Sequence, residues 1–447
     1  MKILTLLHGL RSGALNILQL FTAALVGLVM FTNIPLFADK LRFSTSSVAI
    51  APYFDYLLIV LAICLFLLTW RQSIKYIFEP HFLWCIALIS LYVFNVVRFV
   101  YFSSESAMDF AEDDIQRLRR SALLPVYGFL IYVLGRRYIQ NFIILAVIFL
   151  IPFNFIDFFN PSLFAATSDE FNAYRSDSTY LNANIAGESM ILVLLLLYGR
   201  LGSLPLATLF LFSGMSIITT FSRAAMGAWV LMLGVVMTTR KVAKTFWMMP
   251  LIILMMYTTL ITAADRFLYD LIPNQNQAEQ LIGRLNYWGD ISSDNSGLVN
   301  EEETRGELAL ATLEAVVNKP ILGYVTSPEV DSGTASHNQL LEYWYIYGIF
   351  GVVVWCLTLY LMHRQSTKWI LGFISPEALL FLWFSMFNHQ LFTGAFWMIF
   401  YAMTMIRVDR KMSIAGSGAR FDDFGVKRRR SRRRRKASSR RRTSKLE

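Results

Sequence analysis

Charged residues are scarce in this chain: Asp, Glu, Lys and Arg make up 16% of its 447 residues. Soluble domains carry about 25%. Hydrophobic residues make up 55% and aromatic residues 15%. This composition excludes an ordinary soluble protein and indicates a chain whose solvent is the lipid bilayer.

Cysteine is also scarce, and its placement excludes two kinds of site. Cys64, Cys85 and Cys356 all lie inside hydrophobic runs. The sequence therefore predicts neither a disulfide framework nor a zinc site. It also lacks a glycine loop of the kind that cradles phosphates and a repeat of the solenoid kind.

Long apolar runs are what the sequence does contain. Crossing a bilayer takes about 20 mostly apolar residues per helix, and about twelve runs meet that criterion. They cover residues 13 to 31, 50 to 70, 81 to 102, 121 to 135, 138 to 158, 183 to 199, 203 to 221, 223 to 239, 245 to 264, 337 to 362, 369 to 387 and 389 to 406. The predicted fold is an all-α polytopic membrane protein, with helices one to nine in residues 1–264, a large loop at 265–336 and helices ten to twelve in residues 337–406.

Loop charges predict the orientation, because short cytoplasmic loops carry an excess of Lys and Arg. Alternate connections are basic, and the others are acidic or mixed. The loop at 265–336 holds twelve acidic and four basic residues. The alternation places this loop outside and both termini in the cytoplasm.

The basic character of the chain belongs to its last segment. Residues 407–447 hold seventeen Lys or Arg and four Asp or Glu, with arginine runs separated by serines. Such a run could bind nucleic acid. The favoured interpretation is a disordered cytoplasmic tail that lies against anionic lipid headgroups, because like-charge blocks are commonly disordered.

The loop at 265–336 is predicted to be partly helical. Residues 265 to 296 mix polar and apolar residues, which suggests a piece lying on the membrane surface. A helix is expected from near Glu301 to Asn318, where Lys319-Pro320 stops it. One face of this helix is expected to be buried, because apolar positions recur at helical spacing in Leu308, Thr312, Leu313, Val316 and Val317.

Arg305 lies in the first turns of this predicted helix. A cation there opposes the helix dipole, but together with the helix N-terminus it would suit an anionic ligand such as a phosphate. The alternative is that Arg305 pairs with Glu301, Glu302 or Glu307 at helical spacing.

His337 is the second candidate in this loop. Ser336 followed by Gln339 forms a capping-box pattern, which predicts that His337 lies in the first turn of helix ten. The helix dipole there disfavours the imidazolium, so the neutral ring could act as a general base. Asn338 and Glu342 share one helix face and could orient a partner. The alternative is ordinary packing at the membrane interface.

Three motifs occur in a fixed order in the second half of the chain. They are Thr219-Thr220-Phe221-Ser222-Arg223-Ala224-Ala225, then Thr304-Arg305 with Pro320-Ile321-Leu322-Gly323, and then His337-Asn338 with Gly348-Ile349-Phe350-Gly351. Their order and spacing, and the large outward loop between helices nine and ten, resemble the O-antigen ligase and polymerase superfamily. The resemblance covers residues 215 to 355, and the other helices match only in number and hydropathy.

The resemblance implies a GT-C-like glycosyltransferase of the bacterial inner membrane that acts on the periplasmic face. A glycan would move from undecaprenyl pyrophosphate to a sugar hydroxyl. Arg223 and Arg305 would bind the pyrophosphate, and His337 would take the proton from the attacking hydroxyl, with inversion at the anomeric carbon. No cofactor and no metal are expected, because the acidic clusters at Glu112–Asp114 and Glu301–Glu303 bring no histidine and no ligand spacing.

Four further residues are secondary candidates for substrate contacts. Arg98 and Glu188 lie near the outer ends of helices three and six, where charge is costly and often functional. Snorkelling explains Arg98 equally well. Arg284 lies in the long loop, and Arg175 in the preceding outward loop could guide a saccharide or balance its acidic neighbours.

The acceptor separates two versions of this function. A ligase would use lipid A core and a polymerase another lipid-linked repeat, and the loop placement favours the ligase. A transporter of the lipid-linked glycan is the alternative of another class. Transporters usually place polar residues on broken helices at the bilayer midplane, whereas the polar groups here gather at the outer face.

Overall fold

The computed structural model describes residues 2–42, 49–102, 117–159, 178–180, 182–220, 222–239, 299–326, 338–365, 374–388 and 391–406, with single positions 115, 176 and 328. Within these ranges the chain is helical and has no β-strand. It divides into two units, Met1–Ile17 with Val408–Glu447, and Leu18–Arg407. The candidate site lies in the second unit.

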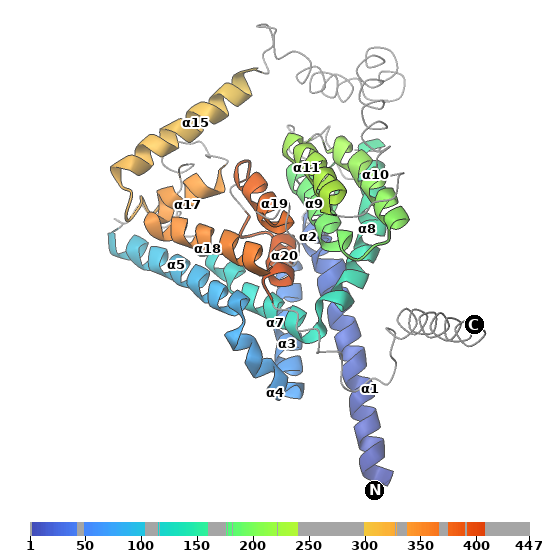
Figure 1. The fold of residues 1–447 in the computed structure, drawn as a ribbon. Helices are drawn as coiled ribbons and strands as arrows, with labels where there is room; N and C mark the ends of the chain where they lie inside the picture. Colours follow the sequence, from blue (N-terminus) through green and yellow to red (C-terminus); the bar gives the residue numbers. More distant parts are fainter. Residues whose placement is uncertain are drawn as a thin grey trace, which may run out of the picture. The chain divides into compact units, whose positions relative to one another are not determined.

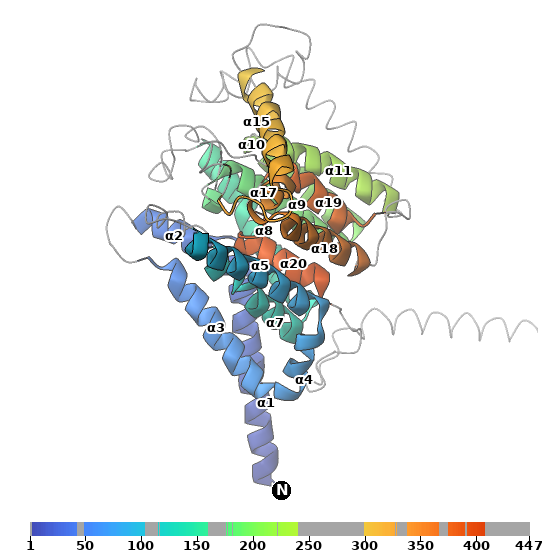
Figure 2. The ribbon, with the colours of Figure 1, turned by 90° about the vertical axis from the view of Figure 1, so that its left-hand side faces the viewer.

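Figures 1 and 2 show the helices in two views. In the first half of the chain they are α1 (Lys2–Ala24) with a π-helical turn (Leu25–Met30), α2 (Ile34–Arg42), α3 (Ala51–Leu68), α4 (Trp70–Ser73) with a 3-10 turn (Ile74–Phe78), α5 (Pro80–Phe102), α7 (Leu124–Leu134), α8 (Arg136–Phe159) and α9 (Ala183–Tyr198). After them come α10 (Ser203–Thr219), α11 (Arg223–Thr239), α15 (Val299–Asn318), α17 (Gln339–Tyr347), α18 (Ile349–Gln365), α19 (Pro376–Ser385) and α20 (Ala395–Met405).

Four of the described helical segments are long and apolar enough to cross a membrane: Gly13–Met30, Ala51–Leu68, Pro80–Tyr101 and Arg136–Phe159. Several shorter apolar helices accompany them. The prediction of an all-helical membrane protein agrees with these segments. The count of twelve spans stays a prediction, and the run at 245 to 264 lies outside the described residues.

Helix α9 lies at the centre of the second unit. Every residue from Ala186 to Tyr198 is buried. Its main neighbours are α8, α10 and α11, which lie beside it in Figure 1. From Met190 to Tyr198 the helix is apolar on all sides, as expected of a buried helix.

The predicted single helix at 337 to 362 is wrong. The chain forms two helices there, because α17 ends at Tyr347 and Gly348 adopts φ +64° and ψ −148° before α18 begins. This backbone conformation is accessible essentially to glycine alone. The apolar run continues through the break, so hydropathy does not reveal it.

Helix α15 confirms the helix predicted to end at Asn318, but its buried face is narrower than predicted. Thr312 is 6% exposed and Val316 is fully buried, whereas Leu313 is 38% and Val317 is 68% exposed. Among the residues that the structure describes, α17 is the helix that α15 contacts most. Apolar spacing alone overstates the width of that contact.

Candidate functional site

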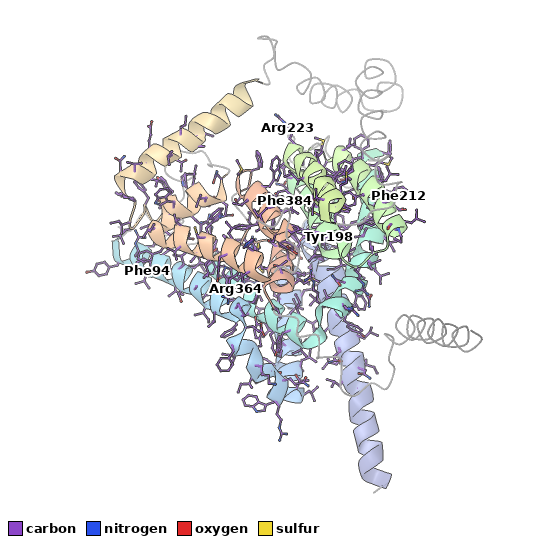
Figure 3. All side chains as sticks on the ribbon, viewed as in Figure 1. Phe94, Tyr198, Phe212, Arg223, Arg364 and Phe384 are labelled. Carbon is purple, nitrogen blue, oxygen red and sulfur yellow. The ribbon has the colours of Figure 1, made fainter. Side chains whose placement is uncertain are left out.

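The start of α11 packs tightly against α9. Arg223 is the first residue of α11 and is half-buried, and Figure 3 shows it at the upper end of that helix. Gly187 of α9 leaves no room for a larger residue, because a Cβ added there would lie 2.6 Å from the Cβ of Ala225. The same Cβ would lie 3.4 Å from the Cβ of Ser222. The first arginine motif is therefore held against the central helix.

Glu188, the next residue of α9, is 2% exposed and accepts two hydrogen bonds. Asn388 donates from Nδ2 at 2.8 Å, and the Trp397 indole donates from Nε1 at 3.1 Å. Burial of a carboxylate requires such donors. Glu188 was predicted as a possible substrate contact, and the structure shows it joining α9 to Asn388, which follows α19, and to Trp397 of α20.

Asn338 caps α17. Its Oδ1 accepts from the backbone N–H groups of Leu340 and Leu341 at 3.0 and 3.1 Å. The helix begins at Gln339. The prediction that Ser336 caps this helix and that His337 lies in its first turn is therefore wrong, because His337 precedes the N-cap. Asparagine is as good an N-cap as serine, so Asn338 was an equal candidate for the cap. The capping-box pattern of Ser336 and Gln339 favoured the serine instead.

The starts of α11 and α17 lie at the same end of the helix bundle. The buried Gln339 accepts through Oε1 from the backbone N–H of Leu391 at 2.8 Å. Three residues earlier, Asn388 bonds to Glu188, whose neighbour Gly187 packs on α11. Asn388 and Leu391 thus link both helix starts. We call this end the motif end.

Two motif glycines form a backbone junction between the end of α15 and the break after α17. Ile349 N–H donates to the Ile321 carbonyl at 3.1 Å. A Cβ added at Gly348 would lie 2.1 Å from that carbonyl oxygen, and one added at Gly323, where φ is +73°, would lie 2.5 Å from the Tyr345 carbonyl oxygen. The second and third motifs are therefore in direct contact, although 24 intervening residues separate Gly323 and Gly348 in the sequence.

Arg98 supports this junction. Its side chain is 9% exposed, donates from Nη2 to the Gly323 carbonyl at 3.3 Å and lies 5.5 Å from the centre of the Phe94 ring. The neighbouring Asn95 donates to the Val325 carbonyl at 2.9 Å. Arg98 is thus buried by the segment after α15 and does not snorkel to solvent.

Glu342 is engaged by an arginine that precedes α7. Its Oε1 lies 3.0 Å from Nη2 of Arg117, and the Glu342 side chain is 4% exposed. This ion pair ties α17 to the segment before α7. Glu342, which was predicted as a residue that could orient a partner, is therefore already paired with Arg117.

Several predicted site residues lie outside the described part of the chain: His337, Arg284 and Arg175. The basic tail also lies outside it. Arg305 lies within α15, and its side chain is likewise not described. Among the residues that the structure does describe, no three His, Cys, Asp or Glu side chains come close enough to hold a metal ion.

A cavity at the motif end was not predicted. Its volume is about 1000 Å³, and its lining includes Arg119, Arg120, Asp55 and Asn388. The two arginines were counted only as charges in an outward loop. The sequence shows them only as a basic pair at the end of an acidic segment. The cavity is formed by helices that are distant in the sequence, so the sequence alone does not reveal it.

Comparison with protein-family models, curated proteins and solved structures finds no match to this chain.

Proposed function

We propose that this chain is an O-antigen ligase-type glycosyltransferase that moves a glycan from undecaprenyl pyrophosphate to a hydroxyl of lipid A core. The reaction would take place at the periplasmic face of the bacterial inner membrane. The observation that supports the proposal most is the meeting of the motif segments. The starts of α11 and α17 are linked through Asn388 and Leu391, and the two glycine motifs contact each other at the backbone.

The proposed chemistry needs a fixed positive charge for the departing pyrophosphate. Arg223 lies at the N-terminus of α11, where the helix dipole adds partial positive charge. Arg305 would supply a second guanidinium from α15. Each of the two arginines can hold one phosphate by a pair of hydrogen bonds. Without them, a metal ion would have to supply the positive charge.

The transfer itself would be a single displacement. The bond between the anomeric carbon and the pyrophosphate oxygen breaks, and its electron pair leaves with undecaprenyl pyrophosphate. The acceptor oxygen forms the new bond from the opposite side, and its proton goes to His337. The configuration at the anomeric carbon is inverted, and no nucleotide sugar or cofactor enters the reaction.

The test is transfer by the purified full-length protein. Incubation with lipid-linked glycan and lipid A core should release undecaprenyl pyrophosphate and increase the mass of the acceptor. His337→Ala should lower the rate by about 10²- to 10⁴-fold, the usual contribution of a general base. His363→Ala, in the last turn of α18, is the matched control and should retain activity.

Each failure has a separate meaning. If the wild type releases no undecaprenyl pyrophosphate from the donor with any acceptor, the protein is not a transferase. If only lipid-linked repeats are extended, it is a polymerase, which breaks the same bond. If His337→Ala is as active as the wild type, another group accepts the proton.

The donor site has its own prediction. Arg223→Lys keeps the charge but loses the paired hydrogen bonds, so the KM for the donor should rise about tenfold, which corresponds to one lost charged hydrogen bond. The KM for the acceptor should not change. A rise confined to the acceptor KM would contradict the assignment of Arg223 to the pyrophosphate.

A further inference from the structure

The cavity at the motif end combines an apolar wall with a basic rim. Its apolar lining includes Leu36 of α2, Ile115 and Phe396 of α20, and its volume is about 1000 Å³. Arg119 and Arg120 also line it, and both are exposed. A drug-sized ligand fills a cavity of about 300–1000 Å³, so this space can hold a large headgroup.

The lining of the cavity holds two arginines and two carboxylates, Asp39 and Asp55. Asp39 accepts from the backbone N–H groups of Ile50 and Ala51 at the start of α3, with 2.8 Å to Ala51. Those hydrogen bonds direct the Asp39 carboxylate to the backbone of α3. Asp55 is then the lining carboxylate that competes with an anionic ligand for the two guanidinium groups.

The cavity also adjoins the proposed donor site. Asn388 and Trp397 line the cavity and donate the two hydrogen bonds to the buried Glu188. Gly187, the residue before Glu188 in α9, packs against the start of α11, where Arg223 lies. The cavity lining is therefore connected to the first arginine motif through two consecutive residues of α9.

We propose that this cavity binds a phosphate-bearing glycolipid, whose phosphate contacts Arg119 and Arg120 and whose acyl chains lie along the apolar wall. Building on the proposed function, this glycolipid is the acceptor. An ordinary phospholipid headgroup would leave most of the volume empty. The sugars of a glycolipid would fill it and meet polar lining groups, which include those of Asn33 and Thr393.

The first test is direct binding to the purified full-length protein without any donor. The probes are lipid A with its two phosphates and the same glycolipid after the phosphates are removed. The double variant Arg119→Gln with Arg120→Gln should bind the phosphorylated probe at least about tenfold more weakly, since each charged hydrogen bond is worth a factor of this size. Its binding of the dephosphorylated probe should equal that of the wild type.

The matched control is Arg71→Gln with Lys75→Gln, which removes two cations beyond the C-terminal end of α3, in α4 and the 3-10 turn after it. This variant should bind both probes as the wild type does. All variants keep the basic tail, so its attraction for anionic lipid cancels. Thermal unfolding of each variant verifies that it is folded. Equal binding of the phosphorylated probe by the Arg119 and Arg120 variant and the wild type would overturn the proposal. So would equal displacement of that probe by phosphatidylglycerol at the same concentration, which would identify a general anionic-lipid site.

Transfer kinetics separate this proposal from the proposed function. The double variant should raise the KM for the phosphorylated acceptor about tenfold and leave the KM for the donor unchanged. An unchanged acceptor KM in an active enzyme would refute the acceptor site while the transferase stands. Arginine-dependent binding without any transfer would refute the transferase while the glycolipid site stands.

Discussion

Gly348→Ala should be among the most damaging single substitutions outside the proposed chemistry. The residue has φ +64° and ψ −148°, and an added methyl would lie 2.1 Å from the Ile321 oxygen and 2.4 Å from the Ile321 carbonyl carbon. Both atoms belong to the backbone, so no side chain can turn away. Backbone strain costs about 1–3 kcal/mol. Separating the segments also loses the hydrogen bond from Ile349, about 1 kcal/mol, which gives about 2–4 kcal/mol in total.

Substitutions at two other glycines distinguish the cost of backbone strain from the cost of a steric clash. Gly135 has φ +85°, but an added Cβ meets nothing within 4 Å, so Gly135→Ala should cost only the strain of about 1–3 kcal/mol. Gly234 in α11 has neither problem, and Gly234→Ala should stabilise that helix by about 0.5–1 kcal/mol. Thermal unfolding of the purified proteins in one detergent should rank them Gly234→Ala, wild type, Gly135→Ala, Gly348→Ala. If Gly348→Ala unfolds at or above the temperature of Gly135→Ala, Ile321 does not lie against Gly348.

Three further substitutions test the motif end. Glu188→Gln presents an amide NH₂ to one of the two donors, so it should lower the free energy of unfolding by about 1–3 kcal/mol. Adding Trp397→Phe should recover part of that loss. An unchanged free energy of unfolding for Glu188→Gln would contradict the two hydrogen bonds. Arg117→Gln leaves the buried Glu342 carboxylate without its ion pair and should destabilise the protein by about 1–3 kcal/mol. The double substitution with Glu342→Gln should destabilise it less. A double-mutant cycle of unfolding temperatures measures the coupling, and additive effects would argue against the ion pair. Gly187→Ala forces α9 and α11 apart and should cost about 1–3 kcal/mol in the same unfolding assay, while wild-type stability would show that the contact can relax.

The helices that the sequence predicts well are those with clear ends. The run at 81 to 102 became α5, Pro80–Phe102, and the run at 183 to 199 became α9, Ala183–Tyr198. A proline begins the first and Gly199 follows the second, so composition and boundary signals agree. Asn318 ends α15 for the same reason, because Lys319-Pro320 follows it.

The remaining features depend on contacts that periodicity does not encode. The break at Gly348 is determined by the Ile321 carbonyl, which belongs to a distant segment. The roles of Arg98 and Glu188 depend on partners 200 or more residues away: Gly323 for Arg98, and Asn388 and Trp397 for Glu188. Arg119 and Arg120 became candidate binding residues because they line a cavity together with α2, α3 and α20, which the sequence does not bring together.

The unequal lengths of neighbouring helices have a consequence for the surrounding lipid. Helix α8 has 24 residues and α10, which packs beside it, has 17, so at 1.5 Å per residue they reach about 36 and about 26 Å. A hydrocarbon core of about 30 Å matches neither. If α10 crosses the bilayer as α8 can, the bilayer must thin beside α10 while α8 tilts, at a cost of a fraction of a kcal/mol per Å. Thinning there would bring the headgroup plane closer to the start of α11, which shortens the path of any lipid-borne phosphate to Arg223.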